Sequence, residues 1–166
     1  MNTPTTLPAV RRSVTVKVGI ERAFAAFTEH FGAWWPANHH INPNGYADSF
    51  IEPYVGGRWF ERAPDGSECD WGQVLDWSPP TRVRLSWHLN GAFAYDPDPD
   101  RASEVEVTFT AESASVTRVE LIHRHFERAV DGSQVAAGVS SEGGWGGILS
   151  RYAALVEGRE LAQRLG

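Results

Sequence analysis

The chain has 166 residues, of which 42% are hydrophobic and 22% are charged, a globular composition that excludes a disordered or fibrous protein. A formal charge of −6 disfavours nucleic-acid binding, and the single Cys69 excludes an internal disulfide. No apolar run is long enough to cross a bilayer, and the N-terminus lacks the blocks of a signal peptide. We therefore expect a soluble cytoplasmic protein with no nucleic-acid partner and no membrane insertion.

The first third of the chain predicts a tail, a strand and helices. Residues 1–9 are rich in proline and threonine and are expected to form a flexible tail, whereas residues 10–166 are expected to form a single domain. Valines alternate with polar residues over 10–18, which predicts a strand. Aromatic residues then recur at spacings of three and four over 20–35, which predicts one helix or two short helices.

Six more strands are expected, because segments with a period of two alternate with clear turn signals. They are 49–54, 58–62, 69–77, 81–89, 104–111 and 115–128. Their short connections favour antiparallel hairpins. A helical pattern returns after Asp131 and runs to Leu165. This C-terminal helix should begin near 142–147, or begin earlier and be weak there, because its glycines cost roughly 1 kcal/mol each.

The order of elements predicts an α+β fold. A curved antiparallel sheet of six to seven strands would wrap around a long C-terminal helix, with two short helices after the first strand. The apolar stripe of the helix must pack on the inner face of the sheet. A sheet that curls over a helix encloses a volume, which becomes a ligand pocket wherever side chains do not fill it.

Several segments recur in a characteristic order. They are Gly56-Gly57, Asp65-Gly66, Trp71–Pro80, Val83–Trp87, Thr117–His123 and Gly144–Leu149. In this order they resemble the SRPBCC superfamily, and more narrowly the family named after the C-terminal domain of the activator of heat shock protein 90 ATPase. The resemblance covers roughly residues 10–158 and implies the helix-grip fold. It also implies binding of lipids, sterols, polyketides, plant hormones or metabolites, which some members cyclise or hydrolyse.

Large apolar residues of the predicted inner face and helices are candidates to line the cavity. They are Trp34, Trp35, Trp59, Trp71, Trp87, Phe109, Leu121, Trp145, Leu149 and Tyr152. Each indole ring offers a large apolar face and one N–H donor. The alternative is that these side chains simply fill the core of a small α+β domain.

Three polar side chains are candidates for a catalytic acid or base. His123 and His125 lie two residues apart on a predicted strand, so both should point into the cavity and contact the ligand. The resemblance implies a small residue at position 125, so His125 would narrow the cavity or add chemistry to it. Glu61 is a buried carboxylate if the face that it shares with Trp59 is inward, and a surface charge if Phe60 is inward instead.

No metal or cofactor is expected. A zinc site on the two histidines of the strand would need two further ligands. The candidates Cys69, His39, His40 and Glu61 do not have a diagnostic spacing. His39 and His40 lie in a loop near the expected mouth of the cavity, where exposure to solvent is the simpler interpretation.

Three functions remain open. Binding of a small hydrophobic or aromatic molecule between the sheet and the C-terminal helix is favoured. An enzyme of the cyclase or hydrolase type would use a pocket histidine or glutamate as acid or base. A chaperone-interaction module, which the family name implies, predicts an exposed patch on the outer sheet and little or no cavity. The sequence leaves open a protein partner or a homodimer.

Overall fold

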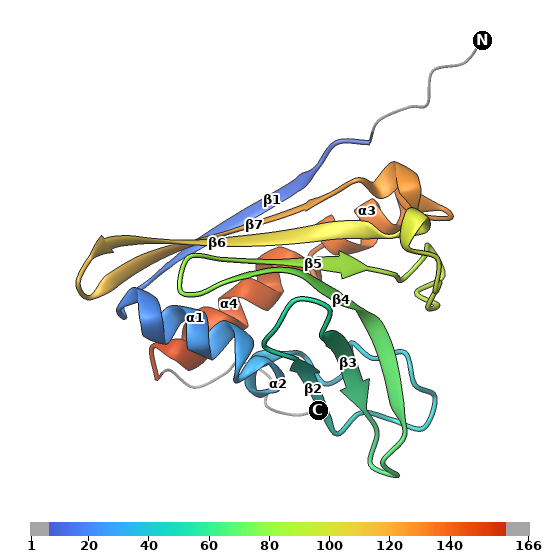
Figure 1. The fold of residues 1–166 in the computed structure, drawn as a ribbon, viewed down its shortest axis with the longest axis horizontal. Coiled ribbons are helices and arrows are strands. Elements are labelled where there is room, and N and C mark those ends of the chain that lie inside the picture. The colour runs from blue at the N-terminus through green and yellow to red at the C-terminus, as the bar shows by residue number, and fades with distance from the viewer. Residues whose placement is uncertain (1–6, 159–166) are drawn as a thin grey trace.

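A computed structural model describes residues 7–158. Seven antiparallel strands form a curled sheet in the order β1-β7-β6-β5-β4-β3-β2 (Figure 1). The strands are β1 (Val10–Val16), β2 (Asp48–Ile51), β3 (Arg58–Arg62), β4 (Glu68–Ser78), β5 (Arg82–Trp87), β6 (Ser103–Ser113) and β7 (Val116–Arg124). Neighbours along the sheet are joined by hairpins wherever the connection is short, as the turn signals predicted.

The helices lie against the concave side of this sheet. They are α1 (Ile20–Thr28), α2 (Phe31–Trp34), α3 (Gly132–Ser140) and α4 (Trp145–Val156), with short 3-10 helices η1 (Pro99–Arg101) and η2 (Phe126–Arg128). The sheet curls around α4, and α1 and α2 lie beside it (Figure 1). The predicted α+β helix-grip fold is therefore confirmed, including two short helices after the first strand.

The C-terminal helical region is divided into two helices. A Cβ on Gly144 would lie 2.0 Å from the carbonyl oxygen of Val139, so the chain turns too tightly here for any other residue. The turn separates α3 from α4, so the expected start of the C-terminal helix near 142–147 is confirmed at Trp145, and α3 is a separate helix before it. The predicted continuation of the apolar stripe to Leu161 and Leu165 lies outside the described residues.

The last strand is shorter than predicted. It ends at Arg124, because His125 adopts a left-handed conformation (φ 67°) and starts η2. Within residues 7–158, none of the helices is both long and apolar enough to cross a membrane. The division into a tail at 1–9 and one domain at 10–166 stays a prediction.

Side chains fill the centre of the curl. The ring of Phe27 makes edge contacts with Phe109 and Tyr152, with centroids 5.8 and 5.3 Å apart. The Tyr152 hydroxyl donates to the carbonyl of Ala23 at 2.7 Å, and burial raises its pKa. Buried side chains thus occupy the space between the middle of the sheet and α4. Six predicted lining residues lie in this packed interior: Trp34, Trp59, Phe109, Leu121, Leu149 and Tyr152.

Candidate functional site

A cavity of about 300 Å³ opens at one end of the curl, beneath the linker between α3 and α4. Its walls come from three segments far apart in sequence: the loop after α2, the β5–β6 region and the α3–α4 region. They contribute Trp35, His39, Trp87, Phe93, Gly138, Val139, Ser141, Gly143, Gly144, Trp145 and Ile148. We call this space the upper hollow.

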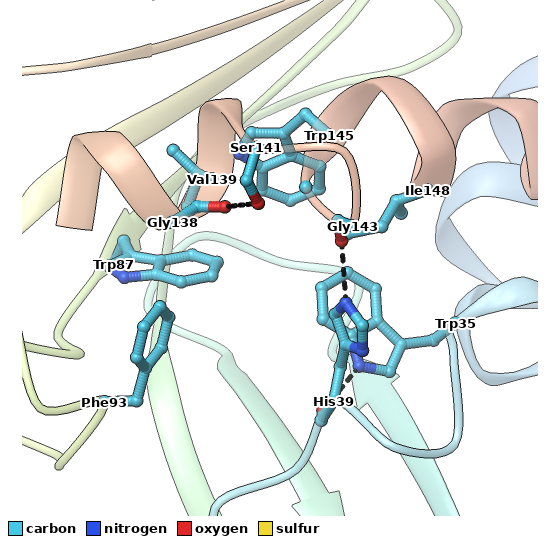
Figure 2. Close-up of a pocket in the computed structure, with 11 residues that line it drawn as sticks. Trp35, His39, Trp87, Phe93, Gly138, Val139, Ser141, Gly143, Trp145 and Ile148 are labelled. Atoms are coloured by element: carbon cyan, nitrogen blue, oxygen red, sulfur yellow. Dashed lines mark hydrogen bonds between the residues drawn. The ribbon is translucent and has the colours of Figure 1, made fainter. Parts of the chain in front are cut away.

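A second cavity of about 210 Å³, the lower hollow, shares Trp35, His39, Trp87 and Phe93 with the first. Its remaining walls are Asn38, His40, Ile41, Trp71 and Leu89. Figure 2 shows Trp87 and Phe93 along one side of the upper hollow, and Trp35 and His39 along the other. Aromatic faces on both sides of one space suit a flat, apolar guest.

Hydrogen bonds fix the wall formed by Trp35 and His39. The Trp35 indole N–H donates to the carbonyl of His39 at 2.8 Å. His39 Nε2 lies 2.8 Å from the Gly143 carbonyl, which can only accept, so this nitrogen carries a hydrogen. His39 Nδ1 lies 2.7 Å from Oδ1 of Asn38. His39 therefore ties the loop after α2 to the α3–α4 linker, with its ring in the wall of both hollows (Figure 2).

His123 is fully buried behind this site. The Trp145 indole N–H donates to Nδ1 of His123 at 3.0 Å, and Ser103 Oγ lies 2.8 Å from its Nε2. Because an indole nitrogen only donates, Nδ1 accepts and the ring hydrogen sits on Nε2. Desolvation lowers the pKa of His123 from 6.5 to about 3, so the ring is neutral. Neither ring nitrogen is free to take a proton from a ligand, and His123 instead holds Trp145 in the wall of the upper hollow.

Glu61 points inward, which decides the alternative that the sequence left open. It is 0% exposed and accepts from the backbone N–H of Ile41 at 2.8 Å, from that of Asn42 at 3.2 Å and from the Trp71 indole at 2.7 Å. Glu61 is not among the lining residues of either hollow. Its carboxylate anchors the loop that carries His39.

His125 does not share a face with His123, contrary to the prediction. The strand ends one residue before it, and the left-handed backbone turns its side chain away from the line of β7. The ring is partly exposed, and its Nδ1 lies 3.6 Å from a Glu127 carboxylate oxygen. His125 is absent from the lining of both hollows.

The structure therefore redraws the predicted site. Trp35, Trp71, Trp87 and Trp145 line the hollows, whereas the other predicted lining residues are core or surface. Phe93 and the glycines of the α3–α4 linker were missed. Phe93 lies between two predicted strands, where side chains follow no period, and the glycines predict only the start of a helix. Over residues 7–158, no three His, Cys, Asp or Glu side chains are grouped so that they could hold a metal ion.

A curled antiparallel sheet gripping a terminal helix, with an aromatic hollow at its end, defines a helix-grip protein of the SRPBCC type. Residues 17–157 match the family described as Activator of Hsp90 ATPase homolog 1-like protein, and the chain belongs to this family. A search of curated proteins gave no match.

Solved structures extend this comparison. An anthrahydroquino-gamma-pyrone synthase, Txn09, is 38% identical over 92% of this chain and 99% of its own, with a TM-score of 0.64. The self-sacrificing resistance protein CalC from Micromonospora echinospora is 32% identical over 91% of this chain and 95% of its own, with a TM-score of 0.65. Protein MLL2253 from Mesorhizobium loti, 21% identical over 93% of this chain and all of its own, shares the fold with a TM-score of 0.65.

Proposed function

We propose that this protein binds a planar, polycyclic aromatic molecule in the hollow between Trp87 and Phe93 on one side and Trp35 and His39 on the other. The single observation that carries the proposal is this pair of facing aromatic walls (Figure 2). The similarity to a synthase named for an anthrahydroquino-gamma-pyrone product supports a fused-ring guest.

Binding would be driven by removal of apolar surface from water. Burial contributes about 25 cal/mol per Å² before the costs of association. Offset-stacked or edge-to-face ring contacts add about 0.5–1.5 kcal/mol for each pair. Few polar groups face the space, so the side chains of His39 and Asn38 would orient any hydroxyl or carbonyl groups on the ligand.

The test is a titration of intrinsic tryptophan fluorescence with 1,8-dihydroxyanthraquinone, a sterol and a fatty acid. Val139→Phe places a ring inside the upper hollow, and its matched control Val130→Phe alters an exposed valine that lines neither hollow. We expect the anthraquinone to bind most tightly, Val139→Phe to weaken it about tenfold or more, and Val130→Phe to leave it unchanged. An absence of binding by folded wild-type protein to the anthraquinone would refute the proposal.

A second candidate function is catalysis, because His39 is a titratable side chain that lines both hollows. His39 would move a proton to or from an oxygen of the bound ligand as a general acid or base. Turnover of aromatic polyketide-type probes, followed by mass spectrometry, should then be lost in His39→Asn to a much greater extent than binding, which is measured by the same fluorescence titration. Equal turnover in wild type and in His39→Asn would reject this role.

Two further expectations accompany the proposal. The chaperone-interaction alternative predicted little or no cavity, so the two hollows count against it. A cytoplasmic location belongs to the proposal as well, and the support for it is that Cys69 is free and that the sequence offers no second cysteine for a disulfide.

A further inference from the structure

Phe93 is the unusual residue of the aromatic walls. It lines both hollows, yet the residue is 42% exposed. Its backbone is left-handed, with φ at 56°. This conformation suits glycine or asparagine and strains a bulky residue. Phe93 is thus a large apolar residue that is partly exposed to solvent and whose backbone conformation is unfavourable for a bulky side chain.

The conformation is imposed by the hairpin between β5 and β6. The Phe93 N–H donates to the Asn90 carbonyl at 2.8 Å, and the Ala94 N–H donates to the Asn90 side chain at 3.1 Å. The Gly91 N–H donates to the Val130 carbonyl at 2.9 Å, which fixes the loop to the start of α3. All of these bonds use backbone groups or Asn90, so glycine at position 93 would keep them and remove the strain.

The ring of Phe93 contacts a second locally unfavourable residue. Gly138 lies inside α3, where alanine would favour the helix. A Cβ at Gly138 would lie 3.0 Å from Cζ and 3.4 Å from Cε2 of Phe93. Both residues line the upper hollow. Phe93, which has a strained backbone, and Gly138, which weakens its helix, therefore contact each other at the edge of the upper hollow. Residues that are unfavourable for their local structure occur mostly at functional sites.

We propose that the contact between Phe93 and Gly138 determines specificity, by setting the largest fused-ring ligand that the hollow admits. The ring of Phe93 closes one side of the space, and the missing Cβ of Gly138 lets that ring sit as deep as it does. This inference rests on the proposed function, since it names the feature of the same site that selects among polycyclic ligands.

The test uses two variants with matched controls. Phe93→Gly removes the ring, and Tyr95→Ala removes an exposed ring of the same hairpin that lines neither hollow. Gly138→Ala crowds the ring, and Gly146→Ala adds a methyl group to α4 with only ordinary contacts. The probes are a two-ring naphthoquinone, the three-ring 1,8-dihydroxyanthraquinone and a four-ring tetracenequinone, titrated by tryptophan fluorescence.

We expect Phe93→Gly to keep or raise the Tm, to weaken the three-ring probe about two- to tenfold, and to improve the four-ring probe relative to it. Gly138→Ala should also keep or raise the Tm and should weaken the larger probes more than the naphthoquinone. Neither control should change the order of affinities. The proposal is overturned if the ratios between probes stay constant in Phe93→Gly, or if its Tm falls and all affinities drop in parallel.

Acrylamide quenching separates this inference from the proposed function. If no quinone binds to wild-type protein, the proposed function fails while Phe93 can still be tested as the cover of the hollow. Quenching of tryptophan fluorescence should rise in Phe93→Gly and not in Tyr95→Ala, because Trp35 and Trp87 line the same two hollows as the ring of Phe93. Equal quenching in wild type and Phe93→Gly would overturn the inference whatever the ligand.

Discussion

The buried His123 should make this protein sensitive to mild acid. Its folded-state pKa is about 3, against 6.5 in a solvated chain, because burial removes water from the ring. The unfolded chain therefore binds a proton below pH 6.5 that the folded protein does not accept until about pH 3. The contribution of His123 to the unfolding free energy is complete above pH 6.5. It falls as the pH drops below 6.5 and stops falling near the folded-state pKa.

The expected loss of unfolding free energy follows from how far the pH lies below the unfolded-state pKa of His123. One pH unit below 6.5 is worth about 1.4 kcal/mol, so at pH 5 the loss of unfolding free energy should be about 2 kcal/mol. The assay is urea unfolding followed by far-ultraviolet circular dichroism at pH 7.5 and pH 5. His123→Gln offers an amide oxygen to Trp145 and an amide N–H to Ser103 but does not titrate, so it should lose about 2 kcal/mol less than wild type over this range.

The difference between the two proteins isolates His123, since all other groups titrate in both. His30→Gln, which removes an exposed histidine, is the matched control and should behave as wild type. An equal loss of stability in wild type and His123→Gln would show that His123 protonates freely in the fold. The neutral network from Ser103 through His123 to Trp145 would then be wrong.

Two further predictions concern the frame of the hollows. Glu61→Gln should lower the unfolding free energy by about 2–4 kcal/mol in urea titrations, because an amide N–H replaces an acceptor facing buried N–H donors; an unchanged value would contradict the anchoring role. Gly144→Ala should cost about 1–3 kcal/mol, since its Cβ would meet the Val139 carbonyl, whereas Gly143→Ala, with no atom within 4 Å of its Cβ, should stay within about 0.5 kcal/mol. Equal effects of the two glycine substitutions would contradict the tight turn.

Local sequence patterns predicted most of the fold. The period of two over 81–89, 104–111 and 115–128 predicted three neighbouring strands, and turn signals predicted the hairpins that join them. The glycines predicted a helix start near 142–147 but not the close approach of Gly144 to Val139, which depends on the packing of α3. The predicted end of β7 was wrong for a related reason. A histidine continues a strand pattern well, and only the observed backbone shows that His125 leaves it.

The site was harder to predict because aromatic residues look alike in sequence. The same composition can line a cavity or fill a core, and here it does both. Phe27, Phe109 and Tyr152 pack together in the middle of the curl, and the two hollows lie where the strands and helices end. The rim at that end is made by loops, whose side chains follow no period. Phe93 could therefore not be recognised as a wall residue before its hairpin was placed against α3.

The hydrogen bonds of the buried polar side chains explain why a catalytic acid or base would have to come from the walls of the hollows and not from the interior. Glu61 and His123 are the buried ionisable groups that a sequence pattern favours as catalysts, yet their hydrogen-bonding atoms are taken up by neighbours in the frame. Taking up a proton would break those bonds and loosen Trp71 and Trp145, which they hold in the walls. His39 differs in its place, because its ring lies in the wall of both hollows, although its two nitrogens also have partners in the Gly143 carbonyl and Asn38. A ligand oxygen that replaces Asn38 at Nδ1 would leave the bond from Nε2 to the Gly143 carbonyl in place, so His39 can contact a ligand while it still ties the loop after α2 to the α3–α4 linker.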